Sequence, residues 1–115
     1  MTPRRRERVA PPAADDEWEV RYANNDAAKG WEELCRHAPG NTRAAWQDMR
    51  TRPRAEDHRH TRLHGRLATV TFEGRQLEQR QLEVSGGGRI WYLVDDQRHT
   101  VWLVLAGPGH PKATD

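Results

Sequence analysis

The C-terminal part of the sequence, from Gln79 to Lys112, constrains the fold most strongly. It contains three apolar runs of strand length, separated by two turns. The first turn, Ser85-Gly86-Gly87-Gly88, consists largely of glycine, which adopts positive φ at little cost. The second turn spans Asp95 to Arg98. Strands joined by such short turns pair antiparallel, because a parallel pair needs a long crossover. This region therefore predicts a compact, rigid antiparallel sheet.

The preceding residues predict one further strand and a helical hairpin. Apolar and charged residues alternate from Glu17 to Tyr22, which is typical of a half-buried strand. Helical spacing follows after a cap at Asn24 or Asn25, and Pro39-Gly40 ends this first helix. A second helix begins just after this stop and ends before Pro53. So short a connection predicts that the two helices lie antiparallel.

The spacing of apolar residues changes to a period of two after a polar loop over residues 54–61. The predicted strands of this part cover residues 67–72, 76–84, 90–94 and 100–105. The element order predicts an α+β fold: an N-terminal strand, an antiparallel helical hairpin, then a four-stranded, mainly antiparallel twisted sheet with the helices on one face.

Composition divides the chain into a tail and one domain. Residues 1–16 combine prolines with blocks of charge and predict a disordered tail, whereas residues 17–112 form the predicted domain. Only 35% of all residues are hydrophobic, and no apolar run approaches the ~18 residues of a membrane span. No signal peptide is visible, and Cys35 is the single cysteine. A reducing, cytoplasmic location is the expectation.

The basic residues are mostly arginine and are concentrated in the middle of the chain. The formal net charge is only +2 at pH 7, yet only Lys29 and Lys112 of the 19 basic residues are lysines. Between Arg36 and Arg66 arginines clearly outnumber acids. Arginine suits forked contacts with phosphate and stacking on bases, although an arginine-rich codon usage would give the same total.

Three segments resemble the RelE/ParE superfamily of bacterial toxins. Arg62-Leu63-His64-Gly65 resembles the basic turn that follows the family's helical hairpin. Residues 88–95, Gly-Arg-Ile-Trp-Tyr-Leu-Val-Asp, resemble its central strand, and residues 101–110 resemble its last strand and the Gly-His that follows. The resemblance covers about residues 18–112. It implies either an mRNA-cleaving toxin, usually acting on the ribosome, or a toxin that acts on DNA gyrase, each restrained by a cognate antitoxin.

The chemistry of RNA cleavage indicates which residue types such a site needs. The ribose 2′-OH attacks the neighbouring phosphate, assisted by a base, by cations that stabilise the crowded phosphorane and by an acid for the leaving oxygen. No metal is required, and DNA is excluded as a substrate because it lacks the 2′-OH.

Four residues are the predicted catalytic groups. Arg89 follows a glycine run, where a strand of RNA can approach closely, and the resemblance assigns it to the family's strand arginine. His110 is the candidate for proton transfer, and Lys112 lies close enough in sequence to stabilise charge. Glu83 is a candidate base, with a cross-strand salt bridge to an arginine as the alternative.

A basic rim is predicted to follow the RNA backbone. Its residues are Arg59, Arg62, His64, Arg66, Arg80 and Gln81. The strand before Arg89 carries glutamines where RelE-type members often carry lysines, which also keeps open a non-catalytic, nucleic-acid-binding relative.

The sequence predicts no metal site and no cofactor. The spacing of His58, His60 and His64 is irregular, and Cys35 is the only thiol that could join them. The expected partners are mRNA, the ribosome in some members, and an antitoxin with an acidic patch that covers the basic face. The alternative partner, DNA gyrase, would need no acid–base pair near Arg89.

Overall fold

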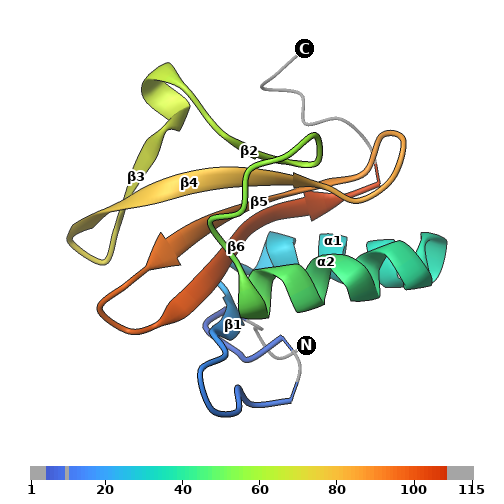
Figure 1. The fold of residues 1–115 in the computed structure, drawn as a ribbon, viewed down its shortest axis with the longest axis horizontal. Helices are drawn as coiled ribbons and strands as arrows, with labels where there is room; N and C mark the ends of the chain where they lie inside the picture. Colours follow the sequence, from blue (N-terminus) through green and yellow to red (C-terminus); the bar gives the residue numbers. More distant parts are fainter. Residues whose placement is uncertain (1–4, 10, 109–115) are drawn as a thin grey trace.

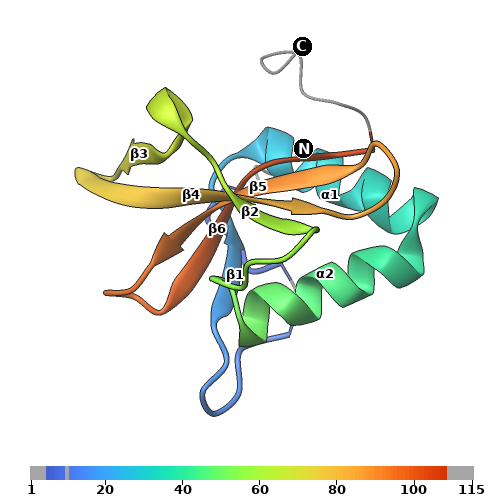
Figure 2. The same ribbon diagram turned by 45° about the horizontal axis from the view of Figure 1, so that its top comes forward.

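The computed structural model describes residues 5–9 and 11–108. In this part of the chain two helices cover one face of a twisted sheet (Figures 1 and 2). The elements in chain order are β1 (Glu19–Tyr22), α1 (Asn25–His37), α2 (Pro39–Thr51), β2 (His60–Arg62), a short 3₁₀ helix (Gly65–Leu67), β3 (Thr69–Phe72), β4 (Arg75–Glu83), β5 (Arg89–Asp95) and β6 (Thr100–Gly107). The α+β class predicted from the sequence is confirmed.

The described strands form one mixed, open sheet of six strands in the order β1-β6-β5-β4-β2, with β3 also paired to β4. The strands β4, β5 and β6 form an antiparallel meander, as the turn residues predict. The N-terminal strand β1 pairs parallel to β6, so the helical hairpin is the crossover between two parallel strands. On the side of β4 that faces away from β5, β3 pairs with the first half of β4 and β2 pairs with the second half.

Strand β2 is absent from the sequence prediction, which placed most of it in a loop. Its three residues are polar, and only His60 is buried, so they show no apolar period. Their extended form comes from pairing with the middle of β4, where Thr61 lies opposite Gln81. A strand this short depends on its partner rather than on its own propensity.

The helices begin where local capping places them. Asn24 caps α1, because its Oδ1 accepts a hydrogen bond from the N–H of Ala27 at 2.7 Å. The second helix starts at Pro39 itself, earlier than predicted, because proline is well accommodated in the first turn of a helix. Ala38 alone separates the helices, and the Thr42 hydroxyl donates to the Leu34 carbonyl at 3.0 Å across this turn.

Apolar side chains form one large cluster between the helices and the sheet and a smaller one on the other face. The large cluster contains Leu34 of α1, Met49 of α2, and Leu82, Ile90 and Tyr92 of the sheet, among others. On the opposite face Leu77, Leu93 and Trp102 pack with partly buried side chains of β3 and β6. Because strand residues alternate between faces, these clusters fix the direction of every side chain on β4 and β5.

The N-terminal segment is not a free tail over its described residues. The backbone N–H of Arg6 donates to Tyr22 at 2.6 Å, and the N–H of Val9 donates to Val20 at 2.8 Å. The side chain of Val9 packs against the main cluster. The prediction of disorder for residues 1–16 is therefore wrong for this segment, which extends the sheet beside β1 (Figure 1).

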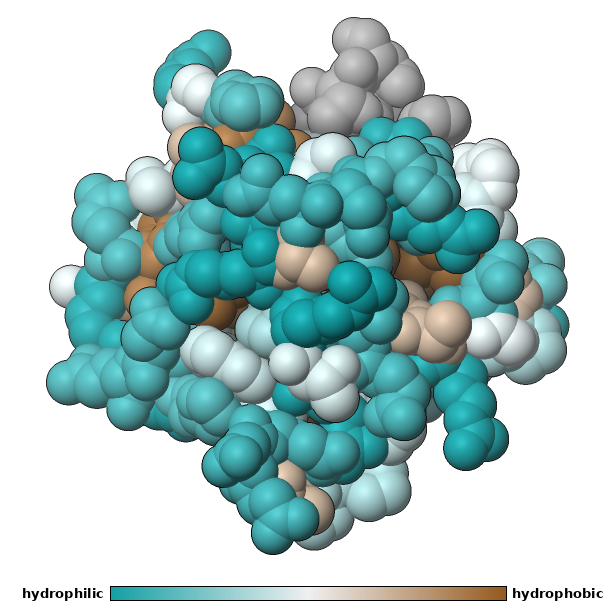
Figure 3. All heavy atoms as spheres, in the orientation of Figure 1, coloured by the Kyte–Doolittle hydropathy of each residue, from teal (hydrophilic) through white to brown (hydrophobic). Residues whose placement is uncertain are grey.

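The face of the molecule seen in Figure 3 is largely hydrophilic, with hydrophobic side chains visible only in small recesses. None of the helices in the described ranges has the length and apolar character needed to cross a membrane.

Candidate functional site

The end of the sheet at the β4–β5 hairpin holds two predicted catalytic residues side by side. Glu83 is the last residue of β4 and Arg89 the first of β5, and the two lie directly opposite each other. Because Leu82 and Ile90 point into the helix-facing cluster, Glu83 and Arg89 point to the opposite face. Glu83 is exposed, and its carboxylate has no hydrogen-bond or ion-pair partner among residues 5–9 and 11–108. The predicted alternative of a salt bridge is not formed there.

Arg89 is held in place by a neutral partner. Its Nη1 donates to the amide oxygen of Gln81 at 3.3 Å, and the same oxygen accepts from the indole N–H of Trp91 at 2.8 Å. The Nε of Arg89 is buried and has no hydrogen-bond partner among residues 5–9 and 11–108. No carboxylate in the described chain forms an ion pair with this guanidinium. Gln81 therefore positions the arginine through its amide oxygen, and the contact with RNA predicted for Gln81 stays a prediction.

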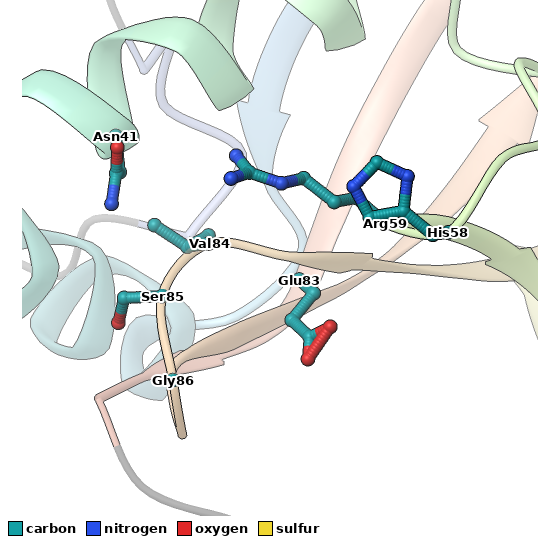
Figure 4. A pocket seen from close by; sticks show the side chains of 7 residues that line it. All are labelled: Asn41, His58, Arg59, Glu83, Val84, Ser85 and Gly86. Atoms are coloured by element: carbon teal, nitrogen blue, oxygen red, sulfur yellow. The ribbon is translucent and has the colours of Figure 1, made fainter.

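A pocket lies beside this pair, at the same end of β4. Its volume is about 370 Å³, and its lining comes from the start of α2, the residues before β2 and the end of β4. The lining residues are Asn41, His58, Arg59, Glu83, Val84, Ser85 and Gly86. In Figure 4 the guanidinium of Arg59 extends toward Asn41, whereas the Glu83 carboxylate points away from both.

The backbone explains why Arg59 belongs to this site. Its carbonyl accepts a hydrogen bond from the N–H of Glu83 at 2.8 Å, which continues the β2–β4 ladder by one residue. Glu83 therefore has Arg59 on one neighbouring segment and Arg89 on the other. Sequence reasoning placed Arg59 only on a general rim and missed His58, Asn41 and Ser85, because the unrecognised strand β2 is what brings these segments together.

The predicted rim residues that follow β2 are exposed but lie around a second, separate pocket. Arg62 and His64 line it together with Glu78, and its volume is about 310 Å³. Arg66 is exposed on the 3₁₀ helix. Within the described ranges none of Arg62, His64 and Arg66 has an ion-pair partner, which agrees with a solvated cationic rim.

Arg80 is not part of any surface, and its predicted contact with RNA is wrong. Its side chain is only 1% exposed. Nη1 donates to Glu78 at 2.9 Å, and Nη2 donates to the carbonyl of Ala55 at 2.8 Å. Arg80 has the same parity along β4 as Leu82, so it points toward the helices. There it ties the loop after α2 to the sheet.

His60 anchors the segment that carries the site. This imidazole is 3% exposed and lies between two carboxylates, with Nδ1 2.8 Å from Asp57 and Nε2 3.1 Å from Asp48. The hydrogen bond with His60 is the main cause that holds the pKa of Asp57 far below its usual range. Asp48 belongs to α2, so His60 joins this helix to β2 and fixes the position of His58 and Arg59.

His110 and Lys112 lie outside the described residues. The described chain ends at Pro108, whose backbone lies against the β4–β5 hairpin: a Cβ added at Gly88 would be 3.4 Å from Pro108 Cα. Gly107 lies opposite Arg89. The roles predicted for His110 and Lys112 stay predictions.

No group of three or more His, Cys, Asp and Glu side chains in the described part of the chain is arranged to hold a metal ion. Cys35 is exposed on α1, and partial desolvation is the largest cause that raises the pKa of its thiol.

Comparison with known protein families, with curated protein sequences and with solved structures finds no match to this chain.

Proposed function

We propose that this protein is an RNA-directed toxin of a toxin–antitoxin pair, which cleaves mRNA at the β4–β5 end of its sheet by attack of the ribose 2′-OH. The observation that carries the proposal is the exposed carboxylate of Glu83, which has no ion-pair partner among the described residues, although Arg59 and Arg89 lie opposite Glu83 on the two neighbouring segments. An acid flanked by two arginines normally forms an ion pair. Here the arginines and the acid all stay available to a ligand that brings a phosphate and a hydroxyl.

Each group has a role in the proposed reaction. The Glu83 carboxylate accepts the proton of the 2′-OH, and the 2′ oxygen then forms a bond to phosphorus. The guanidinium of Arg89 stabilises the charge of the phosphorane oxygens. The bond from phosphorus to the 5′ oxygen breaks, and an acid protonates the leaving oxygen, which leaves a 2′,3′-cyclic phosphate. His110 is proposed as this acid, with Lys112 as an additional cation.

The wider interface and the partners follow from the same surface. Arg62, His64 and Arg66 are proposed to contact neighbouring phosphates, which favours single-stranded RNA that can pass along the β2 edge. A cognate antitoxin with an acidic segment would neutralise this edge, and the cytoplasm is the proposed location because the substrate is there. The RelE-like character of the fold is part of this proposal and is supported by the order of helices and antiparallel strands.

The test is induced expression in cells followed by mapping of RNA ends, together with cleavage of a defined RNA by purified protein. We expect growth arrest and new RNA ends, and no cleavage of the same oligonucleotide when 2′-deoxyribose replaces ribose at the cut position. Glu83→Gln keeps the shape of the side chain and should slow cleavage about 10²-fold or more. Gyrase inhibition without RNA ends, or unchanged cleavage by Glu83→Gln, would refute the proposal.

A further inference from the structure

The pocket at the start of α2 has features that the proposed cleavage step does not use. Cleavage involves Glu83 and Arg89 on the sheet face that points away from the helices, whereas Arg59 extends its guanidinium toward Asn41 of α2 (Figure 4). His58 lies next to Arg59 in the same lining. Within the described ranges neither His58 nor Arg59 has a side-chain partner in the protein.

The geometry points to a second phosphate-binding subsite in this pocket, formed by Arg59, His58 and Asn41, which holds a phosphate of the RNA strand next to the one that is cleaved. The inference rests on the proposed function for the identity of the strand. The recognition of a phosphate group rests only on the pocket.

The cavity supplies space, charge and donors for such a group. Its volume of about 370 Å³ falls in the range of ~300–1,000 Å³ that is usual for small-ligand sites. The guanidinium of Arg59, which meets no carboxylate among the residues that the structure describes, offers a fork of N–H donors, which is the preferred contact for phosphate. The Asn41 amide and the Ser85 hydroxyl are neutral donors on the same lining.

The start of α2 adds to this environment and is not the basis of the site. The helix has no acidic residue in its first turn and no side-chain cap, so its own first turn does not offset the positive end of its dipole. Glu83 is the one acid in the lining, and its carboxylate points away from Arg59 and Asn41 (Figure 4). A phosphate between these two residues therefore avoids the carboxylate.

The two sites are connected through the backbone. The hydrogen bond from the N–H of Glu83 to the Arg59 carbonyl fixes the pocket against the end of β4. His60 holds the segment that carries His58 and Arg59 against α2, through its contact with Asp48. An RNA strand that crosses the end of β4 therefore meets Arg89 on one side and Arg59 on the other, which fixes its direction relative to Glu83.

The probe for the subsite is adenosine 5′-monophosphate, with adenosine as its control, in a titration followed by NMR of the backbone amides. We expect the monophosphate, but not adenosine, to shift the amides of Asn41, Arg59, Ser85 and Gly86. Arg59→Ala should weaken binding on the order of tenfold or more, because it removes a charged hydrogen bond.

Two further variants separate recognition from folding. Asn41→Asp should also weaken binding, by charge repulsion, although an acid in the first turn stabilises a helix. Arg43→Ala is the matched control, because it also removes one arginine. Arg43 lies on α2 and lines a different groove, with Trp31 and Trp46. Equal binding by Arg59→Ala and Arg43→Ala, or equal binding of adenosine and its monophosphate, would overturn the subsite.

A second experiment tests whether the phosphate belongs to a strand. A six-nucleotide RNA that is 2′-deoxy at the cleavage position should displace the monophosphate. Simultaneous binding of both would overturn the assignment to an RNA strand. Neither titration measures cleavage, so the two proposals can fail separately. Binding of the monophosphate without cleavage of RNA would contradict the proposed function alone. Cleavage of RNA without binding of the monophosphate would contradict the subsite alone.

Discussion

The two ends of the central meander use the same amino acid in opposite ways. At the end with the β3–β4 and β5–β6 turns, here named the paired end, each arginine meets a carboxylate: Arg75 meets Asp95, and Arg98 meets Glu73. At the other end, the open end with Glu83, Arg59 and Arg89, the acid and the arginines lie on neighbouring segments, and none of them forms an ion pair within the described chain. Figure 1 shows these ends on opposite sides of the ribbon. The difference teaches that an arginine stabilises the fold where the fold supplies its counter-charge, and that the arginines without one are those to which we assign ligand binding.

The paired end contains one fully buried carboxylate, and its removal has the largest expected effect on stability. Asp95 is 0% exposed and accepts from Arg75 at 2.9 Å and from the Trp102 indole at 3.1 Å. Asp95→Ala leaves both donors without a partner and should lower the free energy of unfolding by about 3–5 kcal/mol. Urea denaturation measures this loss.

The neighbouring acid provides the control for that variant. The Asp96 side chain is 68% exposed and pairs with Arg54, so Asp96→Ala should cost about 1 kcal/mol or less. Equal losses in the free energy of unfolding for Asp95→Ala and Asp96→Ala would show that the buried ion pair of Asp95 and Arg75 does not stabilise the paired end more than an exposed pair does.

Acid should weaken the paired end by a smaller amount. Burial alone would raise the pKa of Asp95, but hydrogen bonds from Arg75 and Trp102 outweigh it and lower the pKa to about 2. A lowered pKa stabilises the fold above the unfolded value near ~3.9, and this contribution is lost as the pH falls from there toward 2. The loss should amount to about 2 kcal/mol, measured by urea denaturation at a series of pH values. If Asp95→Asn showed the same acid dependence as the parent, the assignment would fail.

The smallest expected effect is at the exposed rim beyond the open end. Arg62 has no ion-pair partner in the described chain, so Arg62→Ala should leave the free energy of unfolding within about 0.5 kcal/mol of the parent. Removing one phosphate contact should lower the slope of log affinity against log salt by about 1. Affinity for a non-cleavable RNA, measured at several salt concentrations, checks this. An unchanged slope would exclude Arg62 from the RNA path.

Local patterns in the sequence were sufficient to predict the α+β class, the two helices and the meander. Periods of 3.6 and 2 and the glycine turn are properties of neighbouring residues. The parallel pairing of β1 with β6 and the short strand β2 depend on partners far along the chain. Their hydrogen bonds are invisible to a local pattern.

The candidate site shows the same division. Arg80 lies on the same face of β4 as Leu82 and is buried there, whereas its charge led the sequence to predict a contact with RNA. Glu83 and Arg89 were predictable as neighbours from the hairpin. The position of Arg59 could not be predicted, because a backbone hydrogen bond to Glu83 of β4 fixes it. The polar segment that contains Arg59 gives no sign of this pairing.

The most direct test of the contrast between the two ends is a pair of arginine variants measured in two assays. Arg89→Ala should slow RNA cleavage by about 10²-fold or more and change the free energy of unfolding by no more than about 1 kcal/mol, since its only side-chain partner in the described chain is a neutral amide. Arg75→Ala should show the reverse, with unfolding easier by about 3 kcal/mol and cleavage by the folded protein unchanged. Destabilisation by Arg89→Ala equal to that by Arg75→Ala, with cleavage intact, would contradict the division of roles between the two ends.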